Sequence, residues 1–415
     1  MNLSIVKLEN GCKVVIGEME GIKSTSLGIG FPIGSVHDPK GKTGISHYIE
    51  HMLFKGTKNR TMDEIKEPIE KVGGILNGST GRESVIYYAK VPHFFSLEAL
   101  EIMMDMVVNP AFDENEMEKE RKVILEEMRM EMDDPYTRVH DIFIQNCWDD
   151  GYGRSILGSL EDLKNISRKD LENFHTRFYG VNNLVISMAG RIDVELKEKV
   201  FEMVEKMKKA SSVCNESKPE YKPKSRFLKE GRRDITQVHV LIGTKAPGKL
   251  DDGYECFLIF DTLMGSGMSS RLFRKIREER GLTYNISSEY IPLRRGGLFL
   301  IYASTSTDGY RELTDSISKE IDEVKNGKIS LEEFEYGKKR FMGELMLSVE
   351  STQANMIRIF DNTITYGEPM DLDDWLKRIE HVEYDEFLST VSEMLKDDWV
   401  LSLVGPSDFI EKVKP

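Results

Sequence analysis

The two halves of this 415-residue chain run through the same order of sequence patterns. In each half a segment that alternates polar and apolar residues comes first, as in a β-strand: STSLGIGFPIG in one half, DITQVHVLIGT in the other. A segment with helical spacing follows each of them, GKTGISHYIEHMLFKG and DDGYECFLIFDTLMG. A chain of this length exceeds what one hydrophobic core organises. The shared order therefore predicts an α+β protein that contains a duplication. We expect two similar α/β sandwich domains, each with a mainly antiparallel sheet covered by helices.

The segment between the two halves, KKASSVCNESKPEYKPKS, concentrates Ser, Lys and Pro and lacks a sustained apolar period. It indicates a linker at 208–225. The linker divides the chain into a first domain at 1–207 and a second domain at 226–415, both of ordinary domain size.

Charge and composition exclude several classes of partner. The net charge of -14 argues against nucleic acid and against anionic membranes. No apolar segment is long enough to span a bilayer, and the N-terminus indicates strand, Asn10-Gly11 turn and strand instead of a secretory signal. The cysteines are scattered and have no paired spacing, which is typical of a reducing compartment. We therefore expect a cytoplasmic protein.

The pattern H-x-x-E-H occurs once, as His47, Glu50 and His51. In a helix, residues four apart lie on one face, so both imidazoles can bind one metal ion. Glu50 flanks that ion and could take a proton from a water that the metal activates, as zinc-assisted hydrolysis requires. The alternative is a chance pattern on an amphipathic helix.

A catalytic zinc site needs a third protein ligand. The other histidines are isolated, so we consider the charged helix predicted at 113–134, which Asp113 would cap and Pro135 would end. Its candidate carboxylates are Glu116, Glu118, Glu120, Glu126, Glu127 and Glu131. Periodicity does not choose among them, although Glu120 and Glu127, seven apart, share a face.

HYIEHMLFKGT followed some seventy residues later by ERKVILEEM resembles the inverted-zincin family of pitrilysin, insulin-degrading enzyme and the mitochondrial processing peptidases. The resemblance runs through the chain and is closest to the short processing-peptidase branch. It implies that His47, His51 and Glu127 bind Zn²⁺ and that Glu50 is the general base. Glu120 matches the family's supporting carboxylate. Glu126 remains the competing third ligand.

VGGILNGSTGRESVIYYAKV resembles the strand with which this family binds the substrate backbone. The resemblance implies that Asn77 contacts a peptide amide and that an extended substrate adds to the strand. The alternative is an ordinary hairpin with a polar tip. Gly78 and Val85 depart from the alanine and threonine that are frequent in the family, which affects fine substrate contacts and leaves the chemistry intact.

LMGSGMSSRLFRKIREERGLTYNISSEY resembles the family's C-terminal glycine-rich loop, helix and strand. Its glycines lack the lysine pattern of a phosphate-binding loop. Arg277 and Tyr284 match the family's substrate-binding arginine–tyrosine pair, in which the arginine holds a carbonyl and the tyrosine stabilises an oxyanion. Without the resemblance, a solvated helix charge and a half-buried strand aromatic would be the simpler interpretations.

Together the resemblances imply a zinc-dependent endopeptidase that hydrolyses peptides or unfolded segments inside a dimeric clamshell chamber, with Glu50 activating the water on the zinc. Larger members carry four such domains in one chain, with the zinc in the first and the arginine–tyrosine pair in the last. This chain has two, so the resemblance implies a homodimer in which Arg277 and Tyr284 complete the partner's site. Two alternatives are a non-catalytic structural or recognition subunit and a metal-dependent hydrolase of non-peptide substrates. Zinc is favoured over manganese or cobalt by ligand type.

Overall fold

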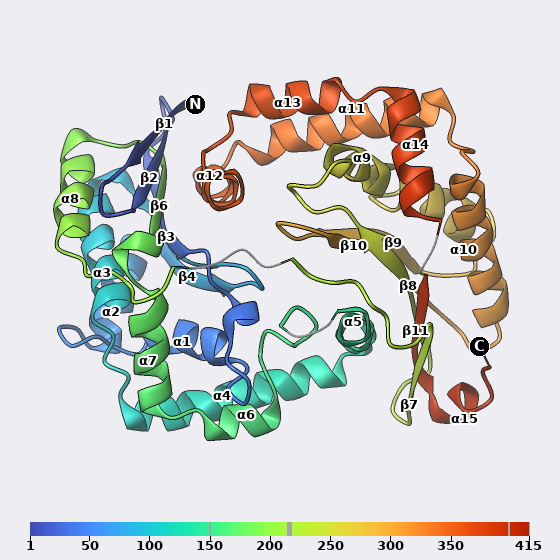
Figure 1. Cartoon of the computed structure of the whole chain (residues 1–415), viewed down its shortest axis with the longest axis horizontal. Coiled ribbons are helices and arrows are strands. Elements are labelled where there is room, and N and C mark those ends of the chain that lie inside the picture. The colour runs from blue at the N-terminus through green and yellow to red at the C-terminus, as the bar shows by residue number, and fades with distance from the viewer. Residues whose placement is uncertain (149–150, 214–217, 397–398, 415) are drawn as a thin grey trace. The chain divides into compact units, whose positions relative to one another are not determined.

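The computed structural model describes residues 1–148, 151–213, 218–396 and 399–414 (Figure 1). The chain forms two compact units, each assembled from three separate segments. Unit 1 consists of Met1–Met128, Arg154–Glu216 and Leu347–Asp371, and unit 2 of Arg129–Gly153, Ser217–Met346 and Leu372–Pro415.

These units do not follow the predicted division along the whole chain. Residues 129–153 precede the predicted linker but pack with the second half, and residues 347–371 follow it but pack with the first. Of the linker itself, residues 214–217 lie outside the described residues, and with them Cys214. The other three cysteines, Cys12, Cys147 and Cys256, are buried and free.

Unit 1 contains a six-stranded sheet in the order β1-β2-β6-β3-β5-β4. The strands are β1 (Asn2–Lys7), β2 (Lys13–Glu18), β3 (Ser24–Phe31), β4 (Ile75–Thr80), β5 (Val85–Pro92) and β6 (Val185–Gly190). Among the described strands of unit 1, β2 and β6 alone pair in parallel, which the long helical connection between them permits. The predicted turn at Asn10-Gly11 joins β1 to β2, and Gly11 adopts the left-handed conformation, with φ 97°, that favours glycine.

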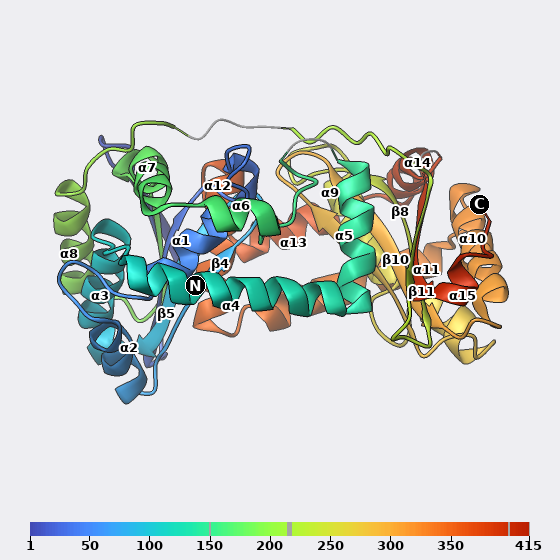
Figure 2. The ribbon, with the colours of Figure 1, turned by 90° about the horizontal axis from the view of Figure 1, so that it is seen from below.

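Helices cover both faces of this sheet (Figure 1). One face packs against α1 (Ile45–Leu53), α2 (Met62–Lys71), α3 (Ser96–Val108), α4 (Glu114–Asp133), α6 (Leu160–Asn165), α7 (Arg168–Phe178) and α8 (Val194–Glu205). The opposite face is covered by α12 (Thr352–Tyr366), which comes from the other end of the chain. Figure 2 shows α4 as one continuous helix.

Glycines in β3 let α12 approach the sheet closely. A Cβ atom at Gly28 would lie 2.4 Å from Met356 Sδ, and one at Gly30 would lie 2.4 Å from the Phe360 ring. With Ile359, these α12 residues bury the outer face of the sheet. A larger residue in β3 would push the helix away.

Unit 2 repeats the topology of unit 1 without its first strand. Its sheet has the order β7-β11-β8-β10-β9, from β7 (Phe227–Arg232), β8 (Val238–Ala246), β9 (Asn285–Pro292), β10 (Gly297–Thr305) and β11 (Val400–Pro406). Again one pair, β7 with β11, is parallel and the others are antiparallel. The helices are α5 (Pro135–Cys147), α9 (Tyr254–Met264), α10 (Tyr310–Lys325), α11 (Leu331–Ser348), α13 (Leu372–Glu380), α14 (Tyr384–Met394) and α15 (Ser407–Ile410).

The two sheets therefore correspond strand by strand, and each has one covering helix from the opposite half of the chain: α12 in unit 1 and α5 in unit 2. The predicted α+β duplication, with mainly antiparallel sheets covered by helices, is confirmed. Across the part of the chain that the structure describes, no helix is both long and apolar enough to cross a membrane.

Candidate metal centre and active site

A buried carboxylate fixes the start of α1, the helix that contains the H-x-x-E-H pattern. Asp38 accepts hydrogen bonds from the Gly44 amide at 2.7 Å and from the Ser46 amide and hydroxyl at 3.2 and 2.6 Å. The two amides are among the backbone groups that a helix start leaves unpaired. The apolar side of α1, including Ile45 and Ile49, lies in the core of unit 1. Asp38 was not predicted from sequence, because its contacts depend on the loop before the helix.

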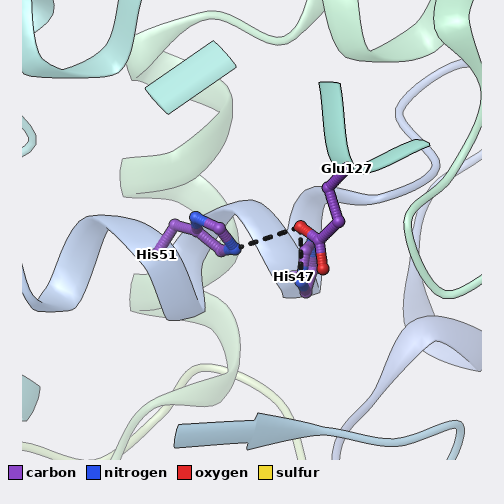
Figure 3. Close-up of side chains that lie close together, drawn as sticks. All are labelled: His47, His51 and Glu127. Atoms are coloured by element: carbon purple, nitrogen blue, oxygen red, sulfur yellow. Dashed lines mark ion pairs between the residues drawn. The ribbon is translucent and has the colours of Figure 1, made fainter. Parts of the chain in front are cut away.

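Glu127 of α4 meets both histidines of α1 (Figure 3). Its Oε2 lies 3.8 Å from His47 Nε2 and 3.6 Å from His51 Nε2, and the three ligand atoms all lie within 4.8 Å of one another. Nitrogen and oxygen ligands lie about 2.0–2.2 Å from a zinc ion, so tetrahedral neighbours are about 3.3–3.6 Å apart. The observed spacing and donor set fit a zinc ion held by these residues.

The two histidines differ in what supports them. Burial, with a smaller contribution from His51, lowers the pKa of His47 to about 3, which keeps the imidazole in the neutral form that binds metals. His47 Nδ1 is buried and has no hydrogen-bond partner within the described residues. His51 Nδ1, in contrast, lies 3.0 Å from Glu120 Oε2. A contact of this kind fixes the ring and leaves Nε2 for the metal.

Glu120 is itself held by a lysine that was not predicted. Lys55 Nζ lies 2.5 Å from Glu120 Oε1, and the Glu120 side chain is buried. Burial raises the pKa of Glu120, but the hydrogen bonds from Lys55 and His51 outweigh it, and the net shift is downward. Glu120 is therefore an anion that connects α4 to α1. Lys55 follows His51 by four residues but lies beyond the end of α1 at Leu53, so helical spacing gave no signal for this contact.

The structure distinguishes the two neighbouring glutamates of α4. Glu127 is partly buried and faces the histidines, whereas Glu126 is exposed and outside the group of potential metal ligands. In the described residues, the group of His47, His51 and Glu127 is the one cluster of at least three such side chains within ligand distance. The remaining histidines, His37, His93, His140, His175, His239 and His381, lie outside it.

Glu50 points to strand β4. The Thr80 hydroxyl donates a short hydrogen bond to Glu50 Oε2. Burial raises the pKa of the Glu50 carboxyl, while the Thr80 hydrogen bond and the His51 charge act in the opposite direction. A partly buried carboxylate beside a metal site has the surroundings of a general base.

A cavity of about 390 Å³ opens beside Glu50 and His51. Its wall includes Phe54 from the end of α1 and Leu76 and Asn77 from β4. Strand β4 is at the edge of the sheet and pairs only with β5 among the described strands. Asn77 is exposed, and its Oδ1 accepts a hydrogen bond of 2.9 Å from the Gly78 amide. An edge strand next to a cavity is a suitable place for an extended peptide to bind.

Arg277 and Tyr284 belong to unit 2 and contact each other. Arg277 lies in η4 (Phe273–Glu278), a π-helical segment, and its guanidinium is 4.7 Å from the centre of the Tyr284 ring and 4.4 Å from that of Phe273. Tyr284 is 73% exposed, so its hydroxyl is open to a ligand. The pair is therefore preassembled by a cation–π contact.

Two family profiles match most of the chain. Residues 13–159 match the profile described as insulinase, peptidase family M16, and residues 165–341 match the one described as peptidase M16 inactive domain. An uncharacterized zinc protease of Bacillus subtilis (strain 168) is 31% identical over 406 residues, covering 96% of this chain and 97% of that protein. The chain belongs to the insulinase family of peptidases.

Other insulinase-family relatives and solved structures agree in length. An uncharacterized zinc protease of Mycobacterium leprae (strain TN) is 30% identical and covers 96% of this chain and 91% of that protein. The crystal structure of a protease from Helicobacter pylori has a TM-score of 0.87 at 21% identity and covers 98% of this chain and 100% of its own. A peptidase M16 inactive domain from Pseudomonas fluorescens gives 0.87 at 18%, covering 98% of both chains. The resemblance to the pitrilysin group is thus confirmed. Both solved structures share the two-unit fold over nearly the whole chain.

Proposed function

We propose that this insulinase-family protein is a zinc-dependent endopeptidase that hydrolyses peptides or unfolded segments. The observation that carries the proposal is the convergence of His47, His51 and Glu127 within 4.8 Å, with Glu50 on the same helix as the histidines. Relatives that are named zinc proteases and match nearly the full chain support the choice of metal.

A bound zinc ion would supply Lewis-acid chemistry, which polarises a substrate carbonyl and makes water more acidic. His47, His51 and Glu127 would hold it. Glu50 would accept a proton from the attacking water and later give it to the leaving amine. Glu120, fixed by Lys55, would hold the His51 ring in place.

The substrate backbone would pair with the free edge of β4, beside the cavity that Glu50 and His51 line. Main-chain pairing gives affinity with little dependence on sequence. Asn77, whose side chain now accepts a hydrogen bond from the Gly78 amide, would exchange that contact for the peptide. The substrate must therefore present an extended segment, which favours peptides and unfolded chains over folded proteins.

Arg277 and Tyr284 would complete the site by binding the substrate carbonyl and stabilising the negative charge that develops on its oxygen. By resemblance to the four-domain members of the family, we propose that they come from a second copy of the chain in a homodimeric chamber. The exposure of the Tyr284 ring supports a role outside its own unit's core.

The decisive experiment compares the wild type with Glu50→Gln for bound zinc and for cleavage of an unstructured peptide. Because Glu50 is the proposed base and not a ligand, the variant should retain one zinc per chain while kcat falls about 10²- to 10⁴-fold. Wild-type turnover in Glu50→Gln would overturn the mechanism. If the wild-type protein binds zinc but cleaves no peptide as either a monomer or a homodimer, the result would favour a non-catalytic subunit instead.

Zinc content also tests the ligand set. Glu127→Ala should lose most of the bound zinc, whereas its neighbour Glu126→Ala, which removes an exposed carboxylate, is the matched control and should keep it. The reverse result would assign the third ligand to Glu126.

A further inference from the structure

One face of strand β4 is turned toward the helix that contains Glu50. Burial alternates along the strand: Ile75, Asn77 and Ser79 are exposed, and the residues between them are partly buried. Strand β4 packs against α1 on this inner side. The strand that is proposed to bind substrate on its edge therefore meets the general base with its inner face.

Two inner-face residues define the position of the Glu50 side chain. At Gly78, a Cβ atom would lie 2.9 Å from Glu50 Cγ and 3.2 Å from both Cδ and Oε1. The Glu50 side chain thus lies directly on the strand, in space that the missing side chain leaves open. Two residues later, the Thr80 hydroxyl donates its hydrogen bond to Glu50 Oε2. Within the described residues, no hydrogen bond is made by the other carboxylate oxygen, Oε1.

A glutamate needs such support to act as a base. Its side chain has three rotatable bonds, and fixing a side chain of this kind costs rotamer freedom. A base must also lie within about 2.6–3.2 Å of the proton that it removes. A hydrogen bond from a hydroxyl to a carboxylate is charge-assisted and is therefore stronger than a hydrogen bond between neutral groups. Thr80 supplies this bond from strand β4.

We propose that Thr80 is a positioning residue for Glu50. Its hydroxyl holds Oε2 so that Oε1 faces the water that attacks the substrate. This inference rests on the proposed function of Glu50 as base. It adds that one six-residue strand sets both partners of the reaction, the substrate backbone on its edge and the base on its inner face. Strand β4 would then fix the distance between the Glu50 carboxylate and the scissile bond, because it contacts both.

The test compares Thr80→Val, which keeps the shape of the side chain and removes the hydroxyl, with Thr80→Ser, which keeps the hydroxyl. Thr80→Val should bind zinc in the wild-type ratio and lower kcat about 10- to 100-fold, the cost of a misplaced catalytic group, with KM changed less than about twofold. Thr80→Ser should restore most of kcat. A wild-type kcat in Thr80→Val, or no rescue by serine, would overturn the proposal.

Two further measurements separate this inference from the proposed function. In crystal structures of the zinc-free proteins, the Glu50 carboxylate should leave Gly78 in Thr80→Val and stay there in Thr80→Ser; an unmoved carboxylate in both would count against the role. In the Glu50→Gln background, Thr80→Val should cause no further loss of the residual rate. If Glu50→Gln itself keeps full activity, the proposed function fails; if only Thr80→Val does, this inference fails alone.

Discussion

At the scale of single residues, the two histidines of HYIEH have unequal supports. His51 is held through Glu120 by Lys55, whereas the buried Nδ1 of His47 has no partner among the described residues. Hydrogen bonds to a metal-binding histidine fix its orientation and raise its basicity. His47 is instead positioned by burial, since its side chain is only 9% exposed. The proposed metal site therefore combines one histidine fixed by polar contacts and one fixed by packing.

Burial of another histidine links the stability of unit 1 to pH. His175 in α7 lies 2.7 Å from the Val107 carbonyl through Nε2 and stacks on Tyr179, with ring centres 4.9 Å apart. Burial lowers the pKa of His175 to about 4. Between about pH 6.5 and pH 4 the unfolded chain binds a proton at this position and the folded chain does not. Stability must therefore fall as the pH drops through that window.

We expect His175→Gln to remove this contribution. Between pH 7 and pH 5, the wild type should lose about 2 kcal/mol more unfolding free energy than the variant, as measured by urea denaturation of unit 1. The variant will be less stable at pH 7, so the informative quantity is the difference between the two pH values in each protein. The other buried histidines contribute equally to both proteins and cancel. Equal pH dependence would show that His175 titrates normally in the folded state.

At this scale the sequence predicted the candidate site residues that a short, regularly spaced pattern defines. His47, Glu50 and His51 are defined by a five-residue pattern on one helix face. Glu127 needed the family resemblance, because periodicity left six glutamates open. Thr80 and Asp38 were missed, since the partner of Thr80 is 30 residues away and that of Asp38 lies across a loop. Such contacts arise from tertiary packing and leave no periodic signal.

At the scale of elements, an ion-pair network holds the segment that contains Arg277. Arg271, 4% exposed, lies two residues before the start of η4 and binds Glu320 of α10 at 2.7 Å, Glu323 at 2.8 Å and Glu333 of α11 at 3.1 Å. It also donates to the Lys328 carbonyl at 2.9 Å. The three carboxylates compensate the burial cost of the guanidinium, and Lys275, which also binds Glu320 and Glu323, offsets part of their mutual repulsion.

Removal of this guanidinium should be costly. In Arg271→Met, Glu320, 6% exposed, keeps only Lys275 as a cationic partner among the described residues. We expect a loss of about 3–5 kcal/mol in the unfolding free energy of unit 2, the usual effect of leaving a buried charge with too few partners. Arg274→Met is the matched control, since Arg274 is exposed in the same segment, and should change stability by less than about 0.5 kcal/mol. Denaturation of both variants checks the expectation, and equal losses would contradict it.

Regular elements were predicted closely where apolar periodicity is strong. The helical segment DDGYECFLIFDTLMG contains α9 (Tyr254–Met264), and the helix predicted at 113–134 is α4 (Glu114–Asp133). The alternating segment STSLGIGFPIG contains β3 (Ser24–Phe31). The π-helical form of η4 was not predicted, because a change from α- to π-type hydrogen bonding leaves the apolar spacing of one turn almost unaltered.

At the scale of the whole molecule, the linker was predicted from a local change in composition. Such a change does not reveal that a segment of each half packs with the unit of the other half. Helices α5 and α12 each leave their own half of the sequence to cover a sheet of the other. Both helices are amphipathic, and an amphipathic pattern predicts that a helix has a buried apolar face but not which sheet that face covers. The duplication was predictable; the exchange of covering helices was not.

The proposed homodimer makes a prediction about mixtures of two inactive variants. One variant is Glu50→Gln, and the other replaces the substrate-binding pair, Arg277→Ala with Tyr284→Phe. If each site combines Glu50 of one chain with the pair of its partner, equal amounts that exchange subunits form heterodimers with one intact site. Peptide cleavage should then recover to about a quarter of the wild-type rate.

The control for that experiment mixes each variant with itself, which should restore nothing. Size-exclusion chromatography with light scattering should find the wild type as a dimer under the assay conditions. No recovery in a mixture that demonstrably exchanges subunits would place the pair in the same chain as the base it serves. A fully active monomer would exclude the shared site altogether.

The route by which α12 reaches unit 1 also bears on how the protein is made. The proposed zinc ligands are synthesised within the first third of the chain, but the sheet of unit 1 then still has an uncovered apolar face at Val15, Ile86 and Val185. The cover arrives only with Met356, Ile359 and Phe360, near the end of the chain. During translation, unit 1 begins to emerge first but is completed only when its last segment, Leu347–Asp371, has been synthesised. Until then its uncovered apolar face is prone to aggregate. A nascent chain interrupted before α12 would contain every proposed zinc ligand and still lack a finished domain to hold them.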